Sequence, residues 1–153
     1  MDIKTPEERS KNMAAIRSTN TKPEVYFRKL LFARGYRYSL NSKNIPGHPD
    51  IYLRKYNTAI FVHGCFWHRH NGCKYATVPE TRAEFWNKKF KTNQKRDCVV
   101  KEELREQKIK CLVVWECTIK QMKRNECIAK EYIRKTEEFL KTCLLYTSDA
   151  ADE

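Results

Sequence analysis

The sequence DIYLRKYNTAIFVH, at residues 50–63, contains the clearest strand signal of the chain. Its two runs, Asp50–Leu53 and Thr58–Val62, are rich in β-branched and aromatic residues and flank a short polar turn. Runs of this length and composition are typical of adjacent antiparallel strands. The stretch therefore predicts a hairpin inside a β-sheet.

The hairpin also indicates a candidate metal site at one end of the sheet. With a turn centred on Tyr56 or Asn57, Asp50 lies opposite Val62 or His63. A carboxylate and a facing backbone carbonyl are hard oxygen ligands that suit Mg²⁺. A simpler interpretation remains open, in which Asp50 is an ordinary acidic residue of the loop before the strand.

The histidines of the chain favour the metal-site interpretation because they cluster. All four, His48, His63, His68 and His70, lie between positions 48 and 70. Imidazole can accept a proton near neutral pH or bind a metal. Several histidines beside a candidate acidic ligand therefore indicate a candidate active site.

A second candidate metal site follows the hairpin. Cys65, His70 and Cys73 have the spacing C-x4-H-x2-C, and Cys117 follows the next predicted strand. Three thiolates and one imidazole form an ordinary tetrahedral Zn²⁺ set that leaves no open position, so we expect a structural zinc. Buried or incidental thiols are the alternative. The remaining cysteines expected to be free thiols are Cys98, Cys111 and Cys127.

Aromatic residues stand beside positive charge in the segment after the hairpin. Phe66 and Trp67 lie inside the expected zinc loop, and Trp86 opens a helix rich in Lys and Arg. Such rings can enter between base steps of DNA if phosphate contacts offset the unstacking. Packing in the core is the alternative role. The candidate phosphate contacts are Lys88, Lys89, Lys91, Lys95 and Arg96.

Capping signals and apolar spacing predict further elements around the hairpin. Thr-Pro-Glu-Glu at residues 5–8 and Thr-Lys-Pro-Glu at 21–24 each open a helix, because Thr caps and Pro suits the first turn. The result is a mixed α/β fold, with helices packed on a small sheet. The expected helices span about 5–17, 22–34 before Gly35, 84–107 and a closing segment around Ile128–Leu140, and the other expected strands are Tyr36–Leu40 and Lys110–Trp115.

The charge of the chain is strongly positive. It has 31 Lys and Arg against 19 Asp and Glu, a formal net charge of +12. This excess favours a polyanionic partner, with nucleic acid ahead of an anionic membrane surface. No apolar run approaches the ~18–20 residues that cross a bilayer, and the N-terminus lacks the apolar segment of a signal peptide. We therefore expect a cytoplasmic protein with reduced thiols.

A chain of 153 residues has room for one domain. We expect this domain over residues 1–142, with a helical N-terminal arm at about 1–20. Residues 143–153, CLLYTSDAADE, contain no Lys or Arg and differ sharply from the preceding sequence. They resemble the translated end of an adapter used in sequencing libraries, so we expect this tail to be non-native.

A series of short motifs also runs along the chain. They are RSKNM at 9–13, TKPE at 21–24, PGHPD at 46–50, FVHGCFWHRHNGC at 61–73, EFW at 84–86, Asn93 with Arg96-Asp97, and VWEC at 114–117. With these motifs the chain strongly resembles the very short patch repair endonucleases, the Vsr family, over about residues 5–142. The block at 61–73 is the most specific of them.

This resemblance implies a fold and an activity. The fold would be restriction-endonuclease-like, with a mixed sheet flanked by helices and a structural zinc loop. The activity would be a Mg²⁺-dependent nick in one strand, beside the T of a T:G mismatch left by deamination of 5-methylcytosine. The substrate would be double-stranded DNA, with general mismatch-repair proteins as candidate partners. The protein would be a monomer in the bacterial cytoplasm, associated with the nucleoid.

The resemblance also implies roles for individual residues. Asp50 and the backbone carbonyl of Val62 would hold Mg²⁺. His68 would be the general base, His63 would assist at the phosphate and Glu24 would orient the histidine. The structural zinc ligands would be Cys65, His70, Cys73 and Cys117, and the residues entering the DNA beside the mismatch would be Met13, Phe66, Trp67 and Trp86.

A non-catalytic zinc-containing DNA-binding module is the main alternative function. It would share the basic surface, the zinc and the aromatic rings, but it would not need Asp50, His63 and His68 together. A structural or protein-interaction domain would leave the clustered histidines unexplained. A small-molecule metalloenzyme would keep an open position on its zinc.

Overall fold

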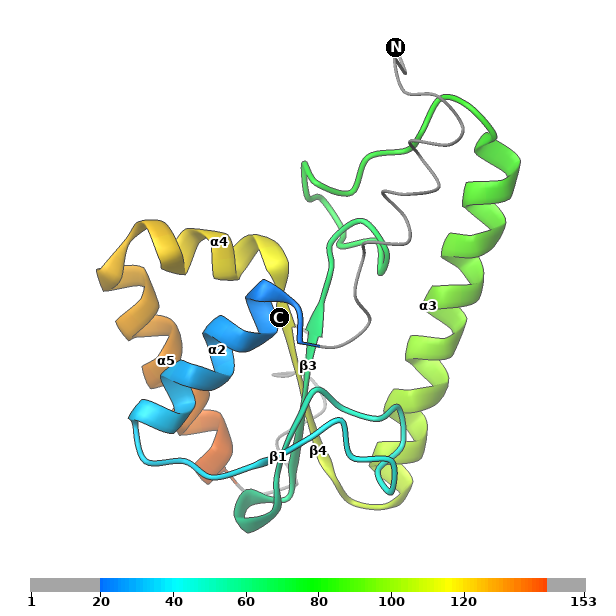
Figure 1. Ribbon diagram of the computed structural model, residues 1–153. Helices are drawn as coiled ribbons and strands as arrows, with labels where there is room; N and C mark the ends of the chain where they lie inside the picture. Colours follow the sequence, from blue (N-terminus) through cyan, green and yellow to red (C-terminus); the bar gives the residue numbers. More distant parts are fainter. Residues whose placement is uncertain (1–19, 143–153) are drawn as a thin grey trace.

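The computed structural model describes residues 20–142 and contains a four-stranded sheet between helices (Figure 1). The antiparallel pairs are β1–β2 and β2–β3, whereas β3 and β4 are parallel, so the sheet is mixed. The strands lie across the sheet in the order β1 (Ser39–Leu40), β2 (Ile51–Leu53), β3 (Thr58–His63) and β4 (Lys110–Trp115).

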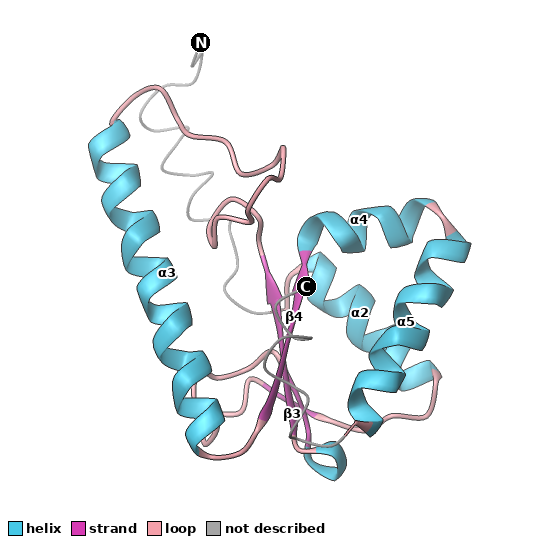
Figure 2. Cartoon of the chain, turned by 180° about the vertical axis from the view of Figure 1, so that it is seen from behind, coloured by secondary structure: helices cyan, strands magenta, loops and turns pink. Residues whose placement is uncertain are grey.

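Helices cover both faces of this sheet, as the two opposite views show (Figures 1 and 2). One face is covered by α3 (Ala83–Glu106), which connects the parallel strands β3 and β4. The other face is covered by α2 (Lys22–Ala33), α4 (Glu116–Arg124) and α5 (Glu126–Lys141). The expected mixed α/β class is therefore confirmed. No helix in residues 20–142 is long and apolar enough to cross a membrane.

The side chains of β3 alternate between two buried clusters. Ile60 belongs to the larger cluster, together with Phe27 of α2. Ala59 and Phe61 belong to the smaller cluster, together with Leu104 of α3. This alternation is expected of an interior strand with both faces covered. The end of β3, where the candidate site begins, is therefore held by packing on both faces.

The expected hairpin is present, but its register differs from the expected one. Tyr52 lies opposite Ala59. A turn centred on Tyr56 or Asn57 would instead place Tyr52 opposite Ile60 or Phe61. The connection instead contains a 3-10 turn at Arg54–Tyr56, followed by Asn57 in a left-handed conformation with φ of 47°. The prediction of the register was therefore wrong.

The boundaries of α2, α3, β4 and α5 agree closely with the expected ones. The hydroxyl of Thr21 accepts a hydrogen bond from the N–H of Glu24 at 3.4 Å, as expected of a helix cap. The first strand is shorter than expected, because only Ser39–Leu40 pair with β2.

α4 was not expected, and it changes the setting of one candidate ligand. It begins directly after β4, so Cys117 lies in the first turn of a helix. The expected helix at about 5–17, the DNA contact expected of Met13 and the expected non-native tail at 143–153 all lie outside the described residues.

Candidate active site and metal centre

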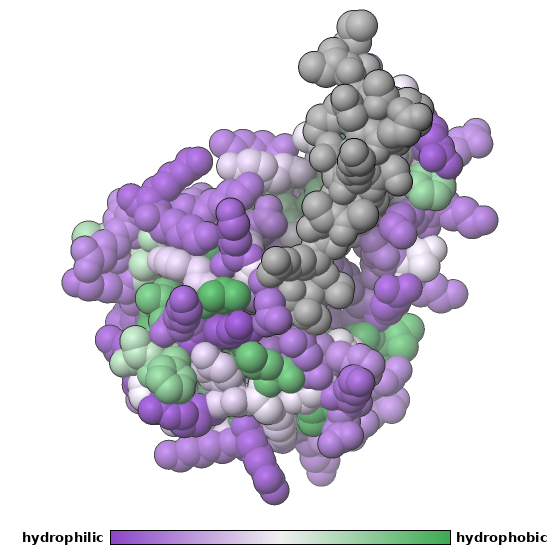
Figure 3. Space-filling model, viewed as in Figure 1, coloured by the Kyte–Doolittle hydropathy of each residue, from purple (hydrophilic) through white to green (hydrophobic). Residues whose placement is uncertain are grey.

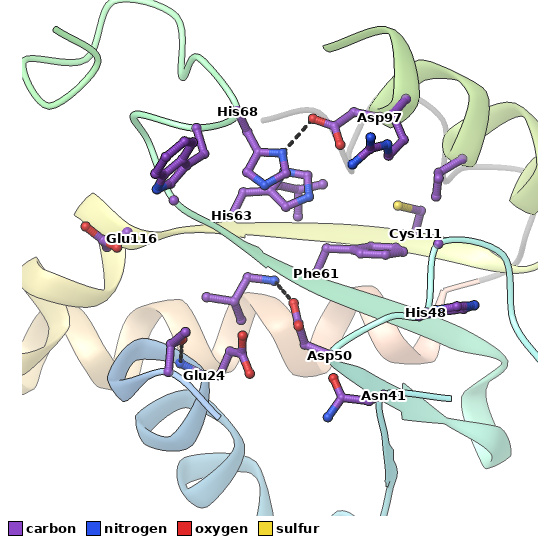
Figure 4. A pocket seen from close by; sticks show the side chains of 18 of the residues that line it. Glu24, Asn41, His48, Asp50, Phe61, His63, His68, Asp97, Cys111 and Glu116 are labelled. Atoms are coloured by element: carbon purple, nitrogen blue, oxygen red, sulfur yellow. Dashed lines mark hydrogen bonds and ion pairs between the residues drawn. The ribbon is translucent and has the colours of Figure 1, made fainter. Parts of the chain in front are cut away.

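A pocket lies at the end of β3, and all four candidate catalytic residues line it (Figure 4). Glu24 comes from α2, Asp50 precedes β2, and His63 and His68 come from the end of β3 and the loop after it. His48 lines the same pocket. The cavity measures about 710 Å³, which is within the range of small-ligand sites. The fold thus brings the predicted catalytic residues to one place.

Asp50 is fixed by the main chain of β3. Its Oδ2 accepts a hydrogen bond from the amide N–H of Val62 at 2.7 Å. Burial, and in addition the negative charge of Glu24, raise the pKa of Asp50 to about 7. A nearby divalent cation would favour the charged form of both acids. The acid pair therefore fits a hard cation such as Mg²⁺.

Glu24 lies beside Asp50. Its side chain is only 4% exposed, and its carboxylate accepts a hydrogen bond from the N–H of Asn20 at 2.9 Å. Figure 4 shows this side chain pointing towards Asp50. The carboxylate that contacts His68 belongs to Asp97.

His63 and His68 form a stacked pair of rings. Their centroids are 3.8 Å apart and their planes differ by 5°. Burial, with the neighbouring His68 as the second cause, lowers the pKa of His63 to about 3. Two parallel imidazoles at this distance repel each other if both are charged. His63 therefore stays neutral in this pair.

Asp97 of α3 fixes the orientation of His68. Its Oδ2 lies 2.7 Å from Nδ1 of His68. Because an ionised carboxylate can only accept a hydrogen bond, Nδ1 carries the hydrogen and Nε2 is left as an acceptor. This is the tautomer that a general base needs. Asp97 was not among the predicted site residues, although it belongs to one of the motifs that resemble the family.

The four candidate zinc ligands also meet. The ligand atoms of Cys65, His70, Cys73 and Cys117 all lie within 4.8 Å of one another, and Sγ of Cys117 is 3.4 Å from Nδ1 of His70. Burial, together with the thiol of Cys117, raises the pKa of Cys65 to about 12. Thiols this close lose their protons together only beside a cation. Their number and chemistry fit a closed tetrahedral Zn²⁺ site.

Trp115, at the end of β4, connects the two clusters. The ring of His70 stacks on Trp115 with a centroid distance of 4.1 Å and an angle of 10°. On the histidine side, Trp115 meets the edge of His63 at 5.4 Å. A continuous series of rings therefore links the candidate zinc ligands to the stacked histidines.

Phe66, Trp67 and Trp86 form an aromatic cluster where the loop after β3 lies against α3. Their centroids are 5.2–5.7 Å apart. All three are half-buried and none belongs to either core cluster. Lys89 and Lys91 are exposed on the same helix, and hydrophilic side chains predominate on the face of the molecule in Figure 3. The rings and the charges are thus both accessible to a large ligand.

Comparisons with known proteins agree with this geometry. The sequence profile of the family described as DNA mismatch endonuclease Vsr matches residues 1–75. The type II nicking enzyme V.NmeAIP of Neisseria meningitidis is 42% identical over 134 residues, which cover 88% of this chain and 92% of that protein. The DNA mismatch endonuclease Vsr of Escherichia coli K12 is 39% identical over 119 residues, which cover 78% of this chain and 76% of that protein.

A further similar protein is the type II nicking enzyme V.XorIIP of Xanthomonas oryzae pv. oryzae. It is 40% identical over 118 residues, which cover 77% of this chain and 86% of that protein. These alignments are longer than the profile match and extend the similarity well beyond residue 75.

The cysteine cluster predicts that the protein binds about one zinc ion per chain. Cys117→Ser removes one ligand, so we expect loss of the zinc and a fall in melting temperature of more than about 5 °C. Cys98→Ser, at an exposed thiol outside the cluster, should change neither. Elemental analysis and circular dichroism measure these quantities. Freshly purified protein without zinc would contradict the site.

The buried acid predicts that Asp50→Asn stabilises the metal-free protein at pH 8. Because burial raises the pKa of Asp50 from 3.8 to about 7, the folded state keeps a proton that the unfolded state releases, and stability falls as pH rises between these values. One pKa unit corresponds to about 1.4 kcal/mol, so we expect a gain of about 1–3 kcal/mol in unfolding free energy at pH 8.

Urea titrations in EDTA at pH 4 and pH 8 measure this effect. At pH 4 the two proteins should differ little, because folded Asp50 is then protonated and unfolded Asp50 is close to its pKa of 3.8, so little of the stability loss has accumulated at this pH. Glu106→Gln, at an exposed acid, is the control. Added Mg²⁺ should stabilise only the wild type at pH 8. An Asp50→Asn protein that is less stable than wild type at pH 8 in EDTA would refute the argument.

Proposed function

Because this chain belongs to the DNA mismatch endonuclease Vsr family, we propose that it nicks one strand of duplex DNA beside the T of a T:G mismatch. Membership in this family supports the activity of a DNA endonuclease. The T:G mismatch as the target and Mg²⁺ as the metal are the further parts of the proposal. One observation carries it: Glu24, Asp50, His63 and His68 line a single pocket, with Asp97 bound to His68. A non-catalytic DNA-binding module has no need of this arrangement.

His68 is the proposed general base. Its Nε2 accepts a proton from the attacking water, while Asp97 holds Nδ1–H and stabilises the imidazolium that forms. His63 stays neutral beside it, because burial keeps its pKa at about 3. A neutral imidazole can donate one hydrogen bond to a phosphate oxygen without competing for the proton. The stacked pair thus separates proton transfer from phosphate contact.

Asp50 and the backbone carbonyl of Val62 are the proposed Mg²⁺ ligands, with Glu24 beside them. The ion would supply charge neutralisation at the phosphate and polarise the water for deprotonation. The Val62 N–H keeps the Asp50 carboxylate oriented. The ligand atoms of His63, His68 and Asp97 also lie within 4.8 Å of one another. We assign His68 and Asp97 to proton transfer and His63 to the phosphate contact, because the Asp97 bond already occupies Nδ1 of His68.

The aromatic cluster supports the choice of a mismatch as the target. A T:G pair stacks and pairs less well than C:G, so opening the duplex there costs less. Phe66, Trp67 and Trp86 would stack against the exposed bases, and Trp67 also lines the catalytic pocket. Lys89 and Lys91 would contact phosphates of either duplex.

The proposal includes the wider setting of the enzyme. The mixed sheet with helices on both faces supports a restriction-endonuclease-like fold. We further propose one domain over residues 1–142, a monomer that acts in the bacterial cytoplasm, and a structural zinc held by the cysteine cluster.

The catalytic roles predict that Asp50→Asn abolishes nicking while DNA binding persists. Asp97→Asn should lower the single-turnover rate about 100-fold, because His68 loses the partner that fixes its tautomer. The measurement uses labelled T:G and C:G duplexes with Mg²⁺ or EDTA, and Glu106→Gln as the control. Wild-type nicking of both duplexes at equal rates, or nicking by Asp50→Asn at the wild-type rate, would refute the proposal.

The aromatic cluster predicts that Trp67→Ala weakens binding to T:G duplex about 10- to 100-fold, the effect of one lost base stack. Binding to C:G duplex should change much less. Replacing Lys89 and Lys91 by Gln should weaken both duplexes together and flatten the salt dependence. Equilibrium binding over a salt series with Ca²⁺ measures both effects. Equal losses on the two duplexes for Trp67→Ala would assign Trp67 a purely structural role.

A further inference from the structure

Arg69 binds the main chain of its own loop at three points. It lies between two candidate zinc ligands, Cys65 and His70, and directly after the proposed base. Its Nη1 donates to the carbonyl of Phe66 at 3.2 Å and to that of Thr77 at 2.9 Å, and its Nη2 donates to the carbonyl of Ala76 at 2.8 Å. The guanidinium therefore connects Phe66, near the start of the loop after β3, to Ala76 and Thr77 further along it.

The same guanidinium lies over the ring of Phe90 in α3 and near that of Phe66 in its own loop. Its central carbon is 4.0 Å from the ring centroid of Phe90 and 5.7 Å from that of Phe66. Phe90 is buried and in turn contacts Phe66 at 5.1 Å and Trp86 at 5.9 Å. A guanidinium can stack with its face and donate from its edge at the same time. An ammonium group cannot do both.

Two further observations indicate that the main chain around Phe66 and Trp67 is fixed. Arg69 has a positive φ of 53°, a conformation that residues other than glycine rarely adopt. Next to Phe66, the carbonyl of Trp67 accepts a hydrogen bond from Nδ2 of Asn93 at 3.1 Å. The carbonyls of Phe66 and Trp67 are thus both held by side chains.

Arg69 also differs from an ordinary phosphate contact. Within residues 20–142 it has no ion-pair partner, yet its edge is already directed at three carbonyls and its face at Phe90. A simple phosphate contact would leave the guanidinium directed at solvent. Three of the five guanidinium N–H groups are therefore already committed to the protein itself.

We propose that Arg69 is a positioning residue for mismatch recognition, which holds Phe66 preformed against Phe90, with Trp67 packed on Phe66. This inference rests on the proposed function. Because Phe66 and Trp67 are already in place, their loop does not have to become ordered when DNA binds, and this raises the affinity. The gain applies to the T:G duplex, where the rings stack on bases, and much less to a matched duplex held through phosphates.

Arg69→Lys tests the proposal because it keeps the charge and removes the planar fork. Arg82→Lys is the matched control, since Arg82 lies 4.5 Å over the ring of Phe85 and its side chain is exposed. With Ca²⁺ in place of Mg²⁺, we expect Arg69→Lys to weaken T:G binding about tenfold, equivalent to ~1.4 kcal/mol. Affinity for the C:G duplex, the salt slope and the zinc content should stay near wild type, as should every property of Arg82→Lys.

A measurement on the free protein separates this inference from the proposed function. Trp67 and Trp86 are half-buried, so acrylamide should quench tryptophan fluorescence more strongly in Arg69→Lys than in wild type. If wild type does not distinguish T:G from C:G, the proposed function fails. The quenching comparison then still tests whether Arg69 holds Phe66 and Trp67 in place. Phe90→Leu, which removes the ring beside the guanidinium together with its contacts to Phe66 and Trp86, should reproduce the quenching change if Arg69→Lys does not fold.

Two results would overturn the inference. Equal losses on T:G and C:G duplexes for Arg69→Lys would make Arg69 a phosphate contact. Wild-type quenching and wild-type T:G preference, in either Arg69→Lys or Phe90→Leu, would mean that the rings hold their positions without the contact between Arg69 and Phe90.

Discussion

The meeting of three thiols and one imidazole fixes the loop after β3 to the first turn of α4. Cys65 and His70 lie on either side of residues 66–69, and Cys117 anchors that segment from the first turn of α4, directly after β4 in the chain. This short segment supplies two rings of the aromatic cluster, the proposed base and the arginine that holds the rings. Without the anchor, a polar loop with few apolar contacts would have little to keep these groups at fixed distances.

Burial acts on the two halves of the pocket in opposite ways. It raises the pKa of Asp50 to about 7 and lowers the pKa of His63 to about 3. In both cases the neutral form is favoured, because the charged form loses its hydration. The free pocket therefore carries less charge than its residues suggest. Asp97 fixes the orientation of His68, and a bound cation would restore the negative charge of the acids.

Continuous sequence signals allowed much of the fold to be predicted, including α3, β4 and the hairpin. α4 could not be predicted because only Ile119 and Met122 are buried along it, too few to give a helical pattern. The hairpin register depended on a 3-10 turn that composition does not reveal. Within the site, residues of the short motifs were expected, but the bond from Asp97 to His68 depends on how α3 packs against the loop. Asp97 looks in sequence like the other charges of that helix.

Trp67 and His68 are consecutive residues of one short segment between Cys65 and His70. With the proposed roles, the ring that contacts the lesion and the imidazole that serves the cut are therefore one peptide unit apart. Each is held by a different contact, since Trp67 packs on Phe66 and the ring of His68 stacks on His63. An inserted residue between them would also change the spacing between Cys65 and His70, so the recognition ring, the base and the candidate zinc site tolerate length changes only together.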